Sequence, residues 1–185
     1  MKQTMRVIAG THRRRQLKSV PTETTRSTRD RVKESLFNML TPLEQYEHCL
    51  DLFAGSGALG IEALSRGVKQ AVFVENQSTA FGVLKENVLD LDLATRSQLI
   101  QTDALAYCQH EDTAFDLILL DPPYHSHLLN RVLEVVCKRN ILAKQGLIVV
   151  LSEREHAFHL PPCLTEVKRR HIGITTVTLL KGANL

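Results

Sequence analysis

The segment from Leu50 to Gly60 carries glycines at a regular spacing. It reads LDLFAGSGALG, so Gly55, Gly57 and Gly60 fit the pattern G-x-G-x-x-G. Glycine lets a backbone approach a ligand without obstruction from a Cβ atom. Glu75 follows Gly55 by 20 residues, a distance at which an acid can bind ribose hydroxyls. The pattern predicts a site for an adenosine-containing ligand, and it leaves open whether that ligand is a dinucleotide or S-adenosylmethionine.

A second group of residues that could take part in chemistry directly follows the apolar run 115–120. It reads Asp121-Pro122-Pro123-Tyr124. The two prolines lack backbone N–H donors, so their carbonyls can act as rigid acceptors. A carboxylate, such a carbonyl and an aromatic face together suit a planar amino group, which has two N–H bonds and a ring that can stack. The alternative is that the prolines only end a strand and that Tyr124 packs in the core.

The elements that must position these residues alternate in type along the chain. Strands that alternate with helices at this spacing favour an α/β fold with a parallel sheet and helices on both faces, in which ligands bind at the carboxyl ends of the strands. A tight turn without a helix joins the last two strands, which are therefore expected to pair as an antiparallel hairpin at one edge. Strands are predicted at 48–53, 71–75, 98–102, 115–120, 146–151, 164–170 and 173–180, and helices at 57–66, 79–91, 103–110 and 126–140, with an earlier one from Thr28 to Pro42.

Positive charge is concentrated near the start of the chain. Residues 1–35 hold ten Lys and Arg against three Asp and Glu, whereas the other residues hold 13 against 17. Two β-prone runs around Gly10 predict a hairpin with Arg13, Arg14 and Arg15 at its tip. We therefore expect a basic N-terminal hairpin arm over residues 1–25, for an anionic partner, and a single catalytic or binding domain over 26–185. The alternative is a charged end that is simply solvated.

Composition excludes several classes of protein. With 185 residues, 43% hydrophobic and 23% charged, the chain is long enough for one folded domain and is neither disordered nor fibrous. No apolar stretch is long enough to span a membrane, and the four cysteines lie far apart, so we expect a cytoplasmic protein with reduced thiols. The pairs His125/His127 and His156/His159 lack a third ligand at useful spacing, and we predict no metal site.

These motifs resemble class I S-adenosylmethionine-dependent methyltransferases that methylate amino groups. The N-terminal block TRSTRDRVKESLFN, residues 25–38, narrows the resemblance to the bacterial 16S rRNA guanine-N2 methyltransferase family that modifies guanine 966 in conventional rRNA numbering. The family pattern has a proline where Ser27 stands here, and serine can cap the helix instead. The resemblance implies a seven-stranded, Rossmann-like sheet of order 3-2-1-4-5-7-6.

The resemblance also implies roles for individual residues and for partners. In related enzymes an acid at the position of Asp103 contacts the adenine amino group, although Asp103 could equally cap the following helix. The implied cofactor is S-adenosylmethionine without a metal, and the implied partner is 16S rRNA within an assembled small-subunit particle. No heptad or long apolar seam in the sequence suggests an obligate dimer, so we expect a monomer. The implied catalytic residues are Asp121, Pro122 and Tyr124; the cofactor-binding residues are Asp51, Phe53, Gly55, Gly57, Glu75, Asn76, Asp103 and Ala104; and the RNA-binding residues are Arg13, Arg14, Arg15, Arg26 and Arg29.

Three other functions remain open at the level of the sequence. An amine other than guanine N2, such as adenine N6 or a glutamine amide, would suit the same acceptors. A nicotinamide-dependent oxidoreductase would share the glycine segment but would give no role to Asp121-Pro122-Pro123-Tyr124. An RNA-binding module without catalytic activity would share only the basic arm.

Overall fold

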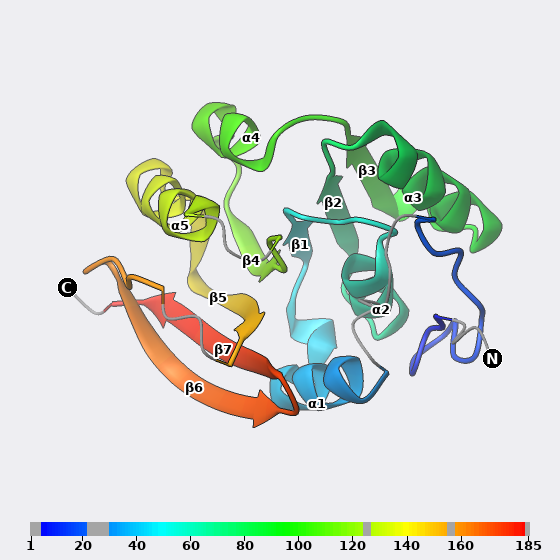
Figure 1. Ribbon diagram of the computed structural model, residues 1–185, viewed down its shortest axis with the longest axis horizontal. Helices are drawn as coiled ribbons and strands as arrows, with labels where there is room; N and C mark the ends of the chain where they lie inside the picture. The colour runs from blue at the N-terminus through cyan, green and yellow to red at the C-terminus, as the bar shows by residue number, and fades with distance from the viewer. Residues whose placement is uncertain (1–4, 22–29, 124–126, 155–157, 184–185) are drawn as a thin grey trace.

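A seven-stranded sheet forms the centre of the molecule (Figure 1). The computed structural model describes residues 5–21, 30–123, 127–154 and 158–183. The strand order is β3-β2-β1-β4-β5-β7-β6, which confirms the order that the resemblance implied. The strands are β1 (His48–Asp51), β2 (Gln70–Val74), β3 (Ser97–Ile100), β4 (Phe115–Leu120), β5 (Leu142–Glu153), β6 (Leu164–Ile172) and β7 (Thr175–Gly182).

The register places the ends of the central strands at one edge of the sheet. β1 pairs in parallel with β2 and β4, β2 with β3, and β4 with β5, whereas β7 is antiparallel to both β5 and β6. The chain order reverses at β1, because β2 lies on one side of it and β4 on the other. The carboxyl ends of β1 and β4 therefore meet at the switch point where open α/β sheets bind ligands.

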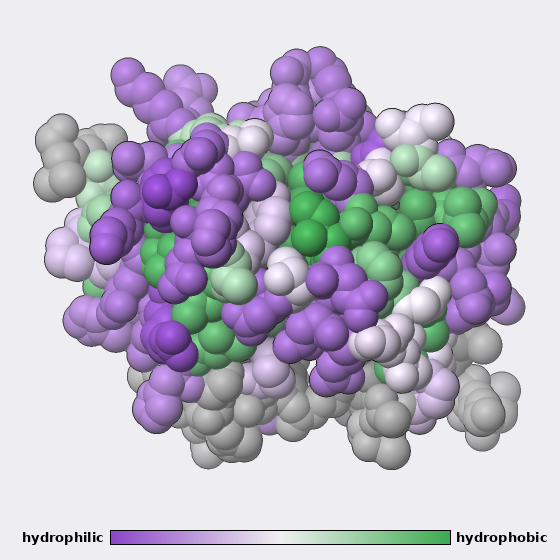
Figure 2. Space-filling view, turned by 90° about the horizontal axis from the view of Figure 1, so that it is seen from above, coloured by the Kyte–Doolittle hydropathy of each residue, from purple (hydrophilic) through white to green (hydrophobic). Residues whose placement is uncertain are grey.

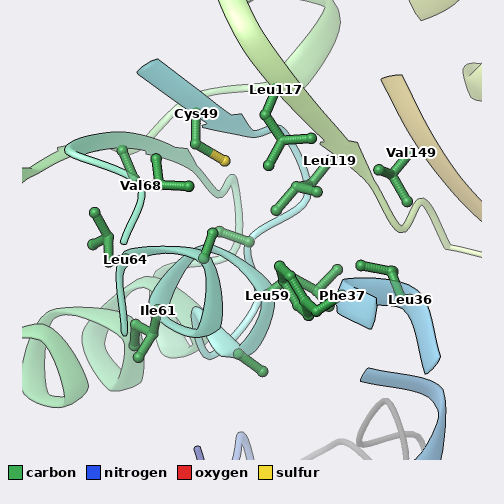
Figure 3. Packing of buried hydrophobic residues seen from close by; sticks show 14 of the residues in the cluster. Leu36, Phe37, Cys49, Leu59, Ile61, Leu64, Val68, Leu117, Leu119 and Val149 are labelled. Carbon is green, nitrogen blue, oxygen red and sulfur yellow. The ribbon is translucent and has the colours of Figure 1, made fainter. Parts of the chain in front are cut away.

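Helices cover both faces of the sheet, as the alternating pattern predicted. Successive residues of the central strands point to opposite faces, so Leu117 and Leu119 join one apolar cluster while Ile118 and Leu120 join the other. Figure 3 shows the first cluster, in which side chains of α1 and α2 pack against β1, β4 and β5. The helices are α1 (Asp30–Leu40), α2 (Ala58–Ser65), α3 (Ser78–Asp90), α4 (Ala104–His110) and α5 (Leu128–Arg139), with short 3₁₀ turns at Leu43–Gln45 and Ala94–Arg96.

The N-terminal segment, residues 5–21, lies against α2 and α3. Its hairpin is hydrogen-bonded but short, with Arg6 and Gln16 forming an isolated bridge among the described residues. Met5, Val7 and Leu17 are buried in the first apolar cluster. The segment is thus packed onto the body of the protein by its apolar side chains.

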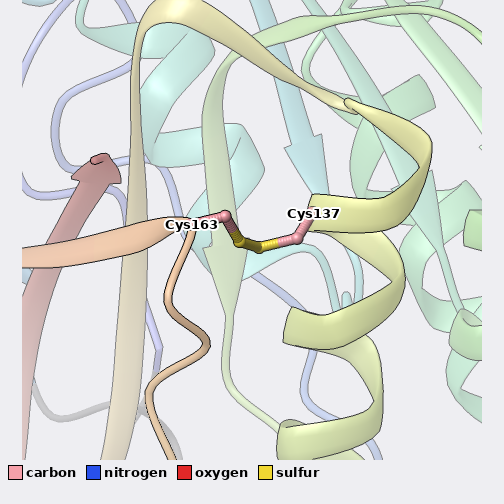
Figure 4. The surroundings of a disulfide bond; sticks show 2 residues. All are labelled: Cys137 and Cys163. Atoms are coloured by element: carbon pink, nitrogen blue, oxygen red, sulfur yellow. A yellow bond between two sulfur atoms is a disulfide. The ribbon is translucent and has the colours of Figure 1, made fainter. Parts of the chain in front are cut away.

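The prediction of four reduced cysteines is wrong for one pair. Cys137, in the last turn of α5, forms a disulfide with Cys163, just before β6 (Figure 4). The two positions are 26 residues apart in sequence, and the packing of α5 beside the start of β6 brings their Cα atoms to 6.3 Å. Cys49 and Cys108 are free and buried, as expected.

One face of the molecule combines polar and apolar areas. Figure 2 shows hydrophilic side chains over much of the face seen from above, with a band of hydrophobic atoms between them. None of the helices in the described residues has the length and apolar character that crossing a membrane requires.

Candidate active site

A cavity of about 420 Å³ opens at the carboxyl ends of β1, β2 and β4. This volume lies within the usual range for small-molecule sites. The cavity brings together residues far apart in sequence, including most of the predicted cofactor-binding set. The predicted residues that line it are Asp51, Phe53, Gly55, Glu75, Asn76, Asp103, Ala104, Asp121 and Pro122.

The glycine turn between β1 and α2 depends on positive backbone angles. Gly55 has φ +53° and Gly57 has φ +86°, a region that side chains with a Cβ rarely adopt. A Cβ on Gly57 would lie 2.6 Å from Leu84 Cδ1, and one on Gly60 would lie 2.3 Å from Phe73 Cε1. Gly57 and Gly60 therefore serve the close packing of the turn and of α2 against its neighbours. Gly57, predicted to bind cofactor, lies behind the cavity wall and not among its lining residues.

Asp51 is a buried carboxylate at the end of β1. Its Oδ2 accepts a hydrogen bond from Gly60 N at 2.9 Å, while Oδ1 has no hydrogen-bond partner among the described residues. Burial, together with the nearby charges of Asp121 and Glu75, raises the pKa of Asp51 to about 7, against the lowering effect of the backbone N–H groups of Gly60 and Phe53.

Glu75 links the end of β2 to the glycine turn. Its Oε2 accepts a hydrogen bond from Gly55 N at 2.8 Å, and its Oε1 accepts one from Gln77 N at 2.8 Å. Each carboxylate oxygen can accept a second hydrogen bond. Glu75 can therefore hold the turn and still bind ligand hydroxyls.

Asp103 caps α4, as the structural alternative predicted. Its Oδ1 accepts hydrogen bonds from Leu105 N at 2.9 Å and Ala106 N at 3.0 Å. Capping uses one of the two carboxylate oxygens, and both Asp103 and Ala104 also line the cavity. Capping and ligand contact are thus compatible.

The segment after β4 faces the glycine turn across the cavity. Asp121 is half-buried, Pro122 is buried and Pro123 is exposed, and all three line the cavity. Asp51 also lines the cavity, and the charge of Asp121 contributes to the raised pKa of Asp51. Tyr124 lies outside the described residues.

Sequence reasoning missed the contribution of the N-terminal segment to this cavity. Met5 and Val20 line it although both are buried and apolar. No motif signals their role, because they reach the site only when the segment packs against the glycine turn.

The predicted RNA-binding arginines occupy different surroundings. Arg13, Arg14 and Arg15 are exposed in or beside the turn of the N-terminal segment, and Arg15 Nη2 donates to Asp90 O at 2.8 Å. Arg26 and Arg29 lie outside the described residues.

Part of the positive charge counted over residues 1–35 is neutralised by ion pairs or buried. Arg6 pairs with Asp30 at 2.8 Å, and Lys18 pairs with Glu86 and Asp90. The amino group of Lys33 is fully buried beside Glu62. The exposed charge of the segment is therefore concentrated at its turn.

No metal site is present in the described residues. They contain no group of three or more His, Cys, Asp or Glu side chains that could hold an ion. His127 and His159 are exposed, whereas His125 and His156 lie outside the described ranges.

Comparison with known proteins places the chain among methyltransferases. The ribosomal RNA small subunit methyltransferase D of Haemophilus influenzae is 37% identical over 181 residues, covering 96% of this chain and 94% of the relative. The protein of the same description from Escherichia coli K12 is 33% identical and covers 91% and 85%. The solved structures of yhhF from Escherichia coli and HI0767 from Haemophilus influenzae match with TM-scores of 0.89 and 0.83, at 31% and 34% identity.

These two structures cover 99% and 98% of this chain and the whole of their own chains. The family described as "Conserved hypothetical protein 95" matches residues 5–181. The N-terminal segment, the cavity and the edge hairpin all fall within that match. The chain therefore belongs to this family, together with its relatives the ribosomal RNA small subunit methyltransferases D.

Proposed function

We propose that the protein transfers a methyl group from S-adenosylmethionine to the exocyclic N2 of a guanine in 16S rRNA, at position 966 in conventional numbering. The observation that carries the proposal is that the segment Asp121–Pro122 lines the same cavity as Glu75 and Asp103. The residues assigned to the nucleoside and those assigned to the amino group thus line one cavity, which supports the proposal.

The residues present fit S-adenosylmethionine. All of the residues to which we assign donor contacts here line the cavity: Glu75 for the ribose hydroxyls, Asp103 and Ala104 for the adenine, and Asp51 for a positive or donating group. When bound, this donor supplies a methyl group already activated by the positive charge on its sulfur. The protein therefore has mainly to orient the acceptor nitrogen toward this methyl group.

We assign the residues after β4 to hold that nitrogen. The carboxylate of Asp121 and the carbonyl of Pro122 can accept the two N–H bonds of a guanine amino group. Such hydrogen bonds strengthen as positive charge develops on the nitrogen, so they stabilise the transition state more than the ground state. Tyr124, which follows them in sequence, is proposed to stack on the base.

The exposed arginine turn is proposed to contact rRNA phosphates. Arg13 and Arg14 extend from it into solvent, and Arg26 and Arg29 are assigned the same role from the sequence. A base paired in A-form RNA hides its reactive edge, so the target guanine must be unstacked. We propose that a monomeric enzyme acts on an assembled small-subunit particle that presents this base.

Mass spectrometry of 16S rRNA tests the function. We expect rRNA from cells lacking the protein to lose one N2-methylguanine, and the wild-type gene to restore it. Comparing methylation of naked 16S rRNA with that of purified small subunits would identify the substrate form. Unchanged modification in the deletion strain would reject the function.

The Asp121→Ala variant tests the assigned role of the segment after β4. We expect single-turnover methylation to slow by about 10²- to 10³-fold, the usual cost of removing a group that stabilises transition-state charge. Asp112→Ala, which removes an exposed carboxylate on the loop before β4, is the control and should retain normal turnover. Normal turnover in Asp121→Ala would remove Asp121 from its assigned role.

A further inference from the structure

A buried amide on α3 joins the glycine turn to the N-terminal segment. Asn87 is 2% exposed. Its Nδ2 donates to Ser56 O at 2.8 Å and to Lys18 O at 3.0 Å, while its Oδ1 accepts from Lys18 N at 2.8 Å. One side chain therefore holds two backbone segments that lie on either side of it.

A second contact joins the same two segments directly. Ser56 Oγ donates to Met5 Sδ at 3.7 Å. Met5 and Ser56 both line the cavity, together with Val20, two residues after Lys18. The N-terminal segment thus forms part of the wall of the cavity, and Asn87 and this contact join it to the glycine turn.

The same segment carries the exposed arginines. Arg13 and Arg14 stand on its turn, and the strand-like parts on either side of that turn are hydrogen-bonded to each other. Within the turn, Thr11 N donates to Ser65 O at 2.8 Å and His12 N donates to Ser65 Oγ at 3.0 Å. A ligand that contacts the arginine turn and a ligand that fills the cavity therefore contact the same packed segment.

We infer that Asn87 is a positioning residue that couples the donor cavity to the RNA-contacting turn, so that donor and RNA strengthen each other's binding. The inference rests on the proposed function, which supplies the two ligands. Both ligands favour the arrangement in which the N-terminal segment is packed against the glycine turn. Linkage requires the coupling to be reciprocal, so RNA must raise donor affinity by the same factor by which the donor raises RNA affinity.

Removing the Asn87 amide breaks the connection at both ends. Asn87→Ala leaves the buried Ser56 O and the partly buried N–H and carbonyl of Lys18 without these partners, which favours separation of the two segments. Asn87→Asp has nearly the same volume and keeps the acceptor for Lys18 N, but it replaces the two donated hydrogen bonds with an oxygen that faces two carbonyls. The two variants therefore separate the effect of hydrogen bonding from that of packing.

The experiment measures the affinity for S-adenosylhomocysteine, with and without small ribosomal subunits purified from cells that lack the protein. This probe fills the donor site without turnover. For the wild type we expect the subunits to tighten its binding by about fivefold or more, the lower end of typical coupling between sites. For Asn87→Ala and Asn87→Asp we expect a ratio near one. Leu89→Ala, which alters an exposed side chain on the same helix, should keep the wild-type ratio.

A merely structural role for Asn87 would change both affinities and leave their ratio intact. A wild-type ratio of one, or an undiminished ratio in either Asn87 variant, would overturn the inference. If both variants fail to fold, Met5→Ala tests the second contact, and an undiminished ratio there has the same consequence. Failure of wild-type protein to bind S-adenosylhomocysteine at all would instead reject the proposed function.

Discussion

The carboxyl group of Asp51 is the ionisable group in the site whose state the fold alters most clearly. It is buried at the end of β1, receives one hydrogen bond from Gly60 N, and lies near two other acids. Burial penalises the charged form, so the pKa rises from its ordinary value of 3.8 to about 7. Between about pH 4 and pH 7 the Asp51 carboxyl group is therefore mostly protonated in the folded protein and mostly ionised in the unfolded chain.

This raised pKa predicts how stability depends on pH. Between the two pKa values the folded state binds one proton more than the unfolded state, so the contribution of Asp51 to the free energy of unfolding falls as pH rises. The slope approaches about 1.4 kcal/mol per pH unit over that window and vanishes above it. Urea unfolding at several pH values should show a shallower decrease for Asp51→Asn than for the wild type. Parallel pH profiles for the two proteins would show that Asp51 ionises normally.

At the scale of the elements, Glu62 on α2 holds the N-terminal segment in place. Its carboxylate, fully buried, accepts from Ile8 N at 2.8 Å and Ala9 N at 3.0 Å and pairs with Arg66 at 2.7 Å. Lys33 lies 3.5 Å from Glu62 and donates to Arg6 O at 2.5 Å. Burial lowers the pKa of Lys33. This buried pair joins α1, α2 and the N-terminal segment.

Breaking this pair should destabilise the fold. Glu62→Ala leaves the Lys33 charge and two backbone N–H groups without their buried acceptor, and we expect the free energy of unfolding to fall by about 3–5 kcal/mol. Chemical denaturation measures this decrease. Glu34→Ala, which alters an exposed acid on α1, is the matched control with an expected change within about 0.5 kcal/mol. A similarly small change in Glu62→Ala would contradict this role.

At the scale of the whole molecule, charge is distributed unevenly between the N-terminal segment and the rest. Ion pairs neutralise Arg6 and Lys18, which leaves Arg13, Arg14 and Arg15 as the exposed cations around the turn. These arginines lie on the segment that also forms part of the cavity wall through Met5 and Val20. The proposed RNA contact and the proposed donor cavity thus share one short segment.

Replacing all three arginines by alanine tests that assignment. Removal of one phosphate-binding arginine should reduce the dependence of log affinity on log salt concentration by about one unit, because fewer counterions are released. For the triple variant we expect weaker binding to small subunits, a shallower salt dependence, and nearly unchanged affinity for S-adenosylhomocysteine in the absence of RNA. An unchanged salt slope would reject this turn as a site of phosphate binding.

The local features of the site could be predicted from the sequence because each depends on neighbouring residues. The glycine turn needs its own positive φ angles, Asp103 caps the helix that directly follows it, and Asp121-Pro122 ends a strand recognisable from its apolar run. Alternation of strands and helices likewise predicted the parallel sheet, and the short final turn predicted the edge hairpin. The sequence by itself therefore determined the fold class and the residues at the carboxyl ends of the strands.

Tertiary structure alone decided which distant segments complete the site. Asn87 meets Lys18 across 69 residues, Ser56 meets Met5 across 51, and Cys137 meets Cys163 across 26. Such contacts leave no periodic or spacing signal, because they depend on how helices and the N-terminal segment pack and not on the conformation of their own neighbours. Lys33 is a further example. The sequence counts it among the basic residues, but the packing of α1 against α2 makes it a buried partner of Glu62.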